Sequence, residues 1–96
     1  MNKKFRAKNE LRSLMNVGPA TQKDLALLGI TTIEQLAQAN PNELYERLQI
    51  ITGTIHDPCV WDVFAAIIHE AKTGEKTPWW HWTSIRKAKY HNPKRS

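Results

Sequence analysis

The 96-residue sequence predicts an all-α fold, and three observations support that class. Apolar residues recur three and four positions apart in several segments, which is the spacing of one helix face. Thr, Asn or Asp precedes these segments, as helix N-caps do, and Gly follows them, as helix C′ residues do. We therefore expect five or six short helices in one domain over residues 1–96, with residues 1–8 and 91–96 as flexible basic tails.

The composition is that of an ordinary globular protein. No apolar run approaches the roughly 18 residues that a membrane-spanning helix needs, and the first residues lack the apolar segment of a secretory signal. The single cysteine, Cys59, cannot form a disulfide within the chain, which agrees with a reducing compartment. We expect a cytoplasmic protein.

Residues 11–30 hold the best-defined pair of helices. Helical spacing joins the apolar residues on each side of a short connection, namely Leu11, Leu14 and Met15 before it and Leu25 and Leu28 after it. The connection contains Asn16 and Gly18, which reach positive φ at low cost, and Pro19, which suits a first helical turn. We expect Val17 to point inward between the helices and Gly29 to end the second one.

This segment resembles a helix-hairpin-helix motif within a compact SAM-like domain. The matching positions are Leu14, Asn16, Val17, Gly18, Pro19 and Thr21. Asn16 replaces the first glycine of the motif, and Ala20 stands where the family often has a lysine. A later segment, residues 52–58, retains a glycine and a helix-starting proline but lacks the turn pattern, so we interpret it as a degenerate second hairpin.

The hairpin predicts a site for phosphate. A turn that leads into a helix leaves free amides around Gly18, Ala20 and Thr21, with the positive end of the helix dipole behind them. We expect Gly18 to have a positive φ and to allow close approach of a phosphate. The candidate DNA-binding residues are Asn16, Val17, Gly18, Pro19, Ala20, Thr21, Lys23 and Arg12. The alternative is that the hairpin is only a compact helical corner, as in many interaction domains.

Three further helices are predicted between residues 31 and 74. Capping-box spacing at Thr31 and Thr32 begins a short helix with an inward face of Ile33, Leu36 and Ala37. Asn40 caps the next helix, which ends at Gly53, has Tyr45 beside its apolar stripe and buries Leu44, Leu48 and Ile51. Asp57 and Pro58 start the longest helix, which runs to about Thr73 and whose apolar face makes it the core helix: Val60, Phe64, Ile67, Ile68 and Ala71.

The last quarter of the chain is aromatic and basic. Trp79, Trp80 and Trp82 lie within four positions, and a final helix from about Trp80 to Tyr90 would place Trp82, Ile85 and Lys89 on one side, with Arg86 nearby. We expect some of the tryptophans to pack across the helical core, with the helix docking by this face and its basic face in solvent. The alternative is an aromatic surface that stacks on bases or meets a protein partner.

Charge is divided unevenly along the chain. Residues 1–23 carry a net charge of +5, residues 24–75 carry −6 and residues 76–96 carry +6. If both ends converge on the hairpin, they form an electropositive surface suited to a polyanion. The alternative is that the terminal lysines and arginines are solvated tails that add only solubility.

The order of the motifs carries a further resemblance. NVGPAT, LxxLGIT, ANPNELYERL, TGTIHDPCVWDVFAA and PWWHWTSIRKA follow one another as in the small bacterial "pathogenicity locus" family, also labelled mitomycin-resistance-protein-like. HDPCVWDVF and PWWxWT are the specific parts. The helical half is also similar to the C-terminal domain of TfoX-type competence regulators. The resemblance implies an all-α helix-hairpin-helix protein with DNA association.

No group of residues indicates catalysis. His56, Asp57, Cys59 and Asp62 lack the paired ligand spacing of a zinc site, and His69, His81 and His91 are scattered. We expect Asp57 to cap a helix, Asp62 to be solvated or paired, and Cys59 to be buried and inert. We expect no enzyme, cofactor or metal.

The function predicted first is therefore DNA binding without sequence specificity, in which the 16–21 hairpin contacts backbone phosphates, most simply of double-stranded DNA. The alternative function is a protein-protein interaction module that uses the helix-hairpin-helix fold as a scaffold and meets its partner through the Trp79, Trp80 and Trp82 region.

Overall fold

The computed structural model describes residue 11 and residues 13–90, without the side chains of residues 89 and 90. This part of the chain is helical and contains no strand, which confirms the all-α prediction. Its five helices are α2 (Pro19–Leu27), α3 (Ile33–Ala37), α4 (Pro41–Thr52), α5 (Cys59–Thr73) and α6 (Trp79–Tyr90). The expected tails at 1–8 and 91–96, and the candidate residue Arg12, lie outside the described residues.

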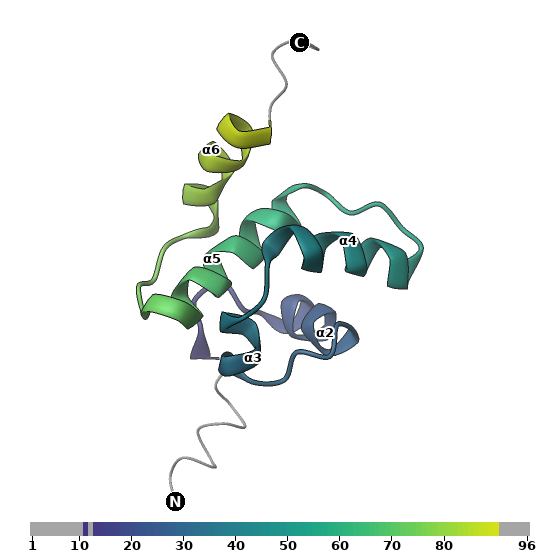
Figure 1. Ribbon diagram of the computed structural model, residues 1–96, viewed down its shortest axis with the longest axis horizontal. Helices are drawn as coiled ribbons and strands as arrows, with labels where there is room; N and C mark the ends of the chain where they lie inside the picture. Colours follow the sequence, from purple (N-terminus) through teal and green to yellow (C-terminus); the bar gives the residue numbers. More distant parts are fainter. Residues whose placement is uncertain (1–10, 12, 91–96) are drawn as a thin grey trace, which may run out of the picture.

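Helix α5 is central, as predicted. It packs against α3, α4 and α6, while α2 packs against α4 (Figure 1). Phe64, Ile67 and Ile68 of α5 join the core, and Val60 and Ala71 pack at its edge. The other buried apolar side chains of this cluster come from the hairpin turn, from helices α2, α3 and α4, and from the connection between α2 and α3: Leu14, Leu25, Leu28, Ile30, Leu36, Leu44 and Leu48.

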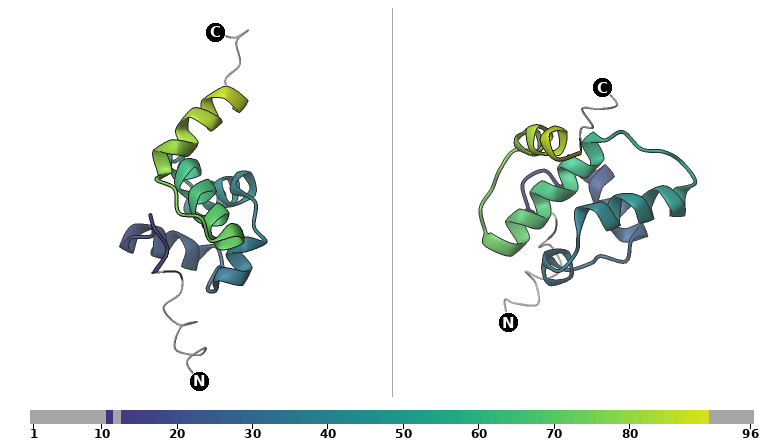
Figure 2. Two further views of the ribbon diagram at one scale, coloured as in Figure 1. Left: turned by 90° about the vertical axis from the view of Figure 1, so that its left-hand side faces the viewer. Right: turned by 45° about the horizontal axis from the view of Figure 1, so that its top comes forward.

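Helix α6 is attached differently from the rest. It projects away from the layer formed by α2, α3 and α4 and lies against α5 (Figures 1 and 2). None of its side chains described at 79–88 is fully buried. The described body begins with the hairpin segment and ends at the far end of α6, so its last residues do not reach the hairpin.

The predicted helix ends are largely confirmed. The Thr32 hydroxyl accepts from the Gln35 N–H, and the Gln35 side chain accepts from the Thr32 N–H, which completes the capping box of α3. Asn40 caps α4 by accepting from two first-turn amides. Gly53 and Gly74 follow α4 and α5 in the left-handed region, at φ values of 67° and 82°.

Two details of these helices differ from the prediction. Ile51, predicted to be buried, is 47% exposed because the last turn of α4 extends beyond the neighbours that cover Leu44 and Leu48. Helix α5 begins at Cys59, one residue later than expected, with Pro58 in the N-cap position. Asp57 still serves the helix start, because its Oδ1 accepts from the Cys59 N–H at 2.8 Å.

None of the helices in the described ranges has the length and apolar character needed to cross a membrane.

Candidate functional site

The hairpin turn is held from two sides. Leu14 is buried, and Val17 packs against the core cluster, as predicted for the residue between the helices. The Met15 N–H donates to Oε1 of Glu70 at 3.0 Å, and Nδ2 of Asn16 donates to the Thr77 carbonyl at 2.8 Å. The turn therefore lies against α5 and the connection that leads into α6.

The positive φ of the turn falls on Asn16, not on Gly18. Asn16 has φ 75°, and Asn tolerates this region better than most residues do. Gly18 has φ −104° and ψ −172°, so the prediction of a positive φ there was wrong. The reason is Pro19, since a residue that precedes proline is pushed into the extended region. A Cβ at Gly18 would meet nothing within 4 Å.

The N-terminus of α2 is open to solvent. Gly18 is its N-cap and provides no side-chain hydrogen bond, while its carbonyl accepts from the Gln22 N–H at 2.9 Å. Pro19, Ala20 and Lys23 are exposed, and Thr21 is half-buried. Of the predicted site residues, Asn16 and Val17 are therefore engaged within the fold, while those from Gly18 to Thr21, with Lys23, share one accessible region.

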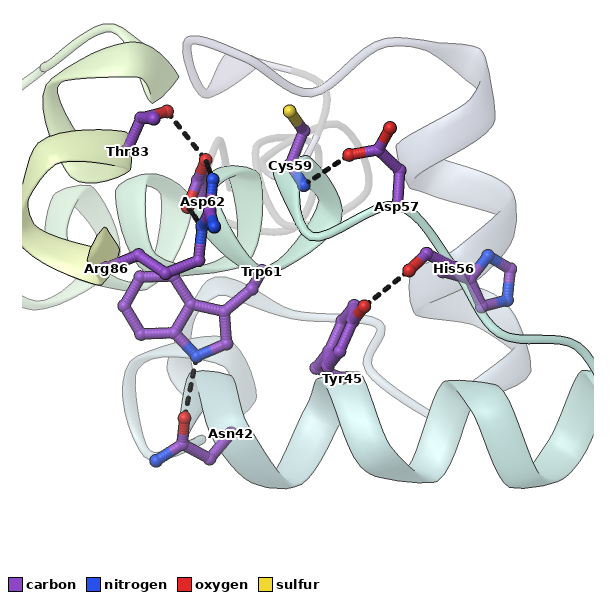
Figure 3. A network of polar contacts seen from close by, with 9 residues as sticks. All are labelled: Asn42, Tyr45, His56, Asp57, Cys59, Trp61, Asp62, Thr83 and Arg86. Carbon is purple, nitrogen blue, oxygen red and sulfur yellow. Dashed lines mark hydrogen bonds and ion pairs between the residues drawn. The ribbon is translucent and has the colours of Figure 1, made fainter. Parts of the chain in front are cut away.

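A buried ion pair joins α5 to α6. Asp62 is 0% exposed, and its two carboxylate oxygens accept from Nε and Nη2 of Arg86 at 2.7 and 3.2 Å (Figure 3). The Thr83 hydroxyl donates to Oδ2 of the same carboxylate at 2.6 Å. The hydrogen bond to Asp62 raises the pKa of Arg86 above its ordinary value. We expected Asp62 to be either solvated or paired, and the structure shows that it is paired and shielded from solvent.

Sequence reasoning missed the role of this network and of Glu70. Asp62, Ala66 and Glu70 are spaced at i, i+4 and i+8, so they form a second stripe on α5 beside its apolar face. All three are buried. One carboxylate binds α6 and the other binds the hairpin turn. The sequence did contain a signal for this network, namely two acidic residues with helical spacing next to a strongly apolar helix face. When other helices pack on that face the acids are buried, and buried acids need hydrogen-bonding or charged partners.

Further polar contacts around Tyr45 and Trp61 join the loop before α5 and the first turn of α5 to α4. Trp61 donates through Nε1 to the Asn42 side chain at 2.7 Å, and the Tyr45 hydroxyl donates to the His56 carbonyl (Figure 3). Burial, followed by the charge of Asp57, raises the pKa of Tyr45. The segment interpreted as a degenerate hairpin is thus tied to α4 by side chains of α4.

Cys59 is half-buried, so the prediction of a buried thiol was wrong. It lies in the first turn of α5, at the rim of the core, where neighbours cover only part of it. A hydrogen bond to the Asp57 carboxylate, with a smaller contribution from burial, raises the pKa of the Cys59 thiol. This environment favours the unreactive thiol over the thiolate.

The polar groups near Cys59 do not assemble a metal site. Nε2 of His56 lies 2.9 Å from the Thr52 hydroxyl, and Asp57 is engaged with Cys59. Within residues 13–88, no three His, Cys, Asp or Glu side chains lie close enough together to hold a metal ion.

The tryptophans of α6 divide into an inner and an outer set. Trp82 is half-buried, donates through Nε1 to the Thr77 hydroxyl at 2.8 Å, and packs against His69 with ring centroids 5.2 Å apart. Trp79 is also half-buried, whereas Trp80 is 61% exposed. None of the three belongs to the core cluster, so the expectation that they pack across it was wrong. The reason is that α6 packs against α5 and projects away from α2, α3 and α4.

Comparison with known proteins identifies the family. The family model described as "Cdd1: Pathogenicity locus" matches residues 4–88. This chain belongs to the pathogenicity locus family. It is 38% identical over 79 residues to a protein of Streptomyces lavendulae named "Mitomycin resistance protein McrB". The aligned region covers 82% of this chain and 75% of that protein. No solved structure matches the chain.

The two segments that we singled out as specific to the pathogenicity locus family meet in space. Asp62 belongs to HDPCVWDVF, and Thr83 closes PWWxWT. Their hydrogen bond, together with the ion pair to Arg86, is the main polar connection between α5 and α6. These segments therefore share a structural task, the docking of the last helix.

Proposed function

We propose that this chain is a non-catalytic DNA-binding protein that contacts backbone phosphates, without marked sequence preference, at the N-terminus of α2. The observation that carries the proposal is the start of this helix. Its first-turn amides receive no side-chain cap from Gly18, and Pro19, Ala20 and Lys23 beside them are exposed. Free amides at the positive end of a helix dipole favour a negatively charged ligand.

The starts of α3, α4 and α5 support this interpretation by contrast. In α3, α4 and α5, a side-chain oxygen of Thr32, Asn40 or Asp57 accepts a first-turn N–H. Those oxygens already occupy the place that an external anion would take. Helix α2 begins with a glycine and an exposed Pro19, so its N-terminus leaves room for a phosphate.

Charge around α2 suits the same ligand. Lys23 is exposed one turn after Pro19. The sequence segment that precedes the hairpin, residues 1–12, contains five basic residues and only Glu10 as an acid. Contacts from backbone amides and lysines read phosphates and not base edges, which is why little sequence preference is expected. Double-stranded DNA is the simplest polyanion to test.

Duplex affinity measured at several salt concentrations tests the proposal. Gly18→Asp places a carboxylate where the phosphate would bind and also caps α2, so it should lower affinity roughly tenfold or more without loss of stability. Gly18→Asn is the matched control, because it caps the helix without adding charge and should lose less affinity.

Charge variants provide the second arm of this experiment. Ala20→Lys should raise affinity and steepen the dependence of log affinity on log salt by about 0.9. Lys23→Ala and Arg12→Ala should each reduce that slope by a similar amount, uniformly across DNA sequences. Wild-type protein that does not bind duplex at low salt, or equal affinities for Gly18→Asp and Gly18→Asn, would refute a phosphate site at α2.

A protein-interaction module is the second candidate function. It is favoured by large apolar side chains at the end of α4 and in the next loop, where Ile50 and Ile55 are 78% and 86% exposed. Sedimentation of the wild type and of the Ile50→Ser, Ile55→Ser double variant measures the simplest case, association with a second copy. Under this function the double variant loses association, whereas Gly18→Asp retains it.

A further inference from the structure

The outward face of α6 combines an exposed indole with positive charge. Trp80 is 61% exposed, and its ring and that of Trp79 are in T-shaped contact at a centroid distance of 5.7 Å and an interplanar angle of 82°. This T-shaped contact restrains the Trp80 ring while leaving much of it in solvent. A restrained, exposed aromatic ring is the kind of surface on which a nucleic-acid base stacks.

Helical spacing aligns polar and charged groups with this ring. Trp80, Ser84 and Lys87 lie at i, i+4 and i+7, so they share one face of α6, and all three are exposed. Lys87 follows Trp80 by about 10 Å along the helix axis. Its flexible side chain can therefore reach a phosphate near a base that is stacked on Trp80.

The Asp62 network determines which face of α6 is free. Thr83 and Arg86 turn inward to the buried carboxylate, which fixes the rotation of the helix on α5 (Figure 3). The same pairing neutralises Asp62, so this acid adds no unpaired charge near the outer face. Residues 76–96 themselves contain six basic side chains and no aspartate or glutamate.

Charge separates this surface from the other exposed apolar one. That surface consists of Ile50 in α4 and Ile55 in the loop after it, and α4 carries Glu43 and Glu46 against a single Arg47. The Trp80 face instead lies on a helix whose only charged side chains are basic. Charge complementarity therefore favours a polyanion for α6.

We propose that the Trp80, Ser84 and Lys87 face of α6 binds single-stranded DNA, with one base stacked on Trp80 and a neighbouring phosphate paired with Lys87. Bases within a duplex are stacked on one another, so only an unpaired strand offers a free base face at low cost. This surface is distinct from the N-terminus of α2, and the inference depends on the proposed function only in taking DNA as the ligand. Stacking recognises any base, so sequence preference is again weak.

Fluorescence anisotropy of a labelled oligothymidylate, titrated with the full chain, tests this inference. Trp80→Ala should weaken binding about tenfold, and Trp80→Phe should retain most of the affinity because it keeps an aromatic face. Lys87→Ala should reduce the slope of log affinity against log salt by about 0.7. Leu27→Ala and Lys72→Ala are matched controls for an exposed apolar and an exposed basic residue, and neither should change binding.

The outcomes separate this inference from the proposed function. If Trp80→Ala loses the oligothymidylate but keeps duplex affinity, while Gly18→Asp does the reverse, both stand. If Gly18→Asp binds duplex like Gly18→Asn but Trp80→Ala still loses the single strand, the α2 site fails and the α6 site stands. Equal single-strand affinity in the wild type and Trp80→Ala, or binding of an acidic protein with no binding of DNA, would overturn the α6 proposal. Unchanged thermal unfolding of Trp80→Ala shows that any loss is local.

Discussion

The hairpin with α2 and the last helix, α6, are attached to the body by opposite kinds of interaction. Leu14, Leu25 and Leu28 anchor the hairpin segment in the apolar core. Helix α6 adds no side chain to that core and is held by Asp62 through Thr83 and Arg86. Apolar anchoring tolerates small shifts because it is not directional, whereas a buried carboxylate demands particular partners. The turn and α2 should therefore stay in place in single polar variants that release α6.

The largest effect is expected from Arg86→Met. It leaves the buried Asp62 carboxylate without its cation, which should cost about 3 to 5 kcal/mol of unfolding free energy in denaturant titrations. Lys87→Met is the control, because the neighbouring exposed lysine should change stability by less than about 0.5 kcal/mol. Adding Asp62→Leu to Arg86→Met should recover much of the loss. A double variant as unstable as Arg86→Met would show that the ion pair does not explain the docking of α6.

The next effect concerns Glu70, the second buried carboxylate of α5. Glu70→Ala removes the acceptor of the Met15 N–H and should cost about 2 kcal/mol, while Glu70→Gln keeps an acceptor and should cost less. Hydrogen exchange of the Met15 amide should accelerate more in Glu70→Ala than in Glu70→Gln. Equal exchange in the wild type and both variants would mean that the apolar contacts alone hold the turn.

Within the turn, Asn16 should matter more than Gly18. Asn16→Ala keeps a Cβ at positive φ and loses the hydrogen bond to Thr77, at an expected cost of about 2 kcal/mol. Asn16→Gly loses only the hydrogen bond and should cost about half as much. Gly18→Ser, at an extended backbone with open space around it, should be neutral or gain a few tenths of a kcal/mol as an N-cap. Thermal unfolding that ranks Gly18→Ser below Asn16→Ala would contradict this assignment.

The smallest effect is chemical and concerns Cys59. Because the hydrogen bond that the Cys59 thiol donates to the Asp57 carboxylate raises the pKa of the thiol, native Cys59 should react with a thiol reagent near neutral pH more slowly than free cysteine does. Asp57→Asn keeps a cap for α5 but removes the carboxylate, so the thiol pKa should fall and labelling should become faster. Labelling rates measured against pH check the sign, and slower labelling in Asp57→Asn would contradict it.

The sequence by itself determined the helices and the apolar core. Periodicity and capping signals located α2 to α6 within one or two residues, because these signals act between residues close in the chain. The apolar face of α5 and the inward position of Val17 followed from the same local rules. The recognised motif order also identified the family to which the chain belongs.

Only the tertiary structure decided which polar groups are buried and what they hold. Asp62 meets Thr83 and Arg86 from more than twenty positions away, and Glu70 meets Met15 from 55 positions away. Helical spacing cannot rank such distant partners, nor can it show that Ile51 lies beyond its neighbours. The extended backbone at Gly18 is different, because it follows from the neighbouring Pro19 and could have been predicted from the sequence. The partners of Asp62 and Glu70 and the exposure of Ile51 are set only when the helices pack against one another, because packing brings together residues that are far apart in the chain.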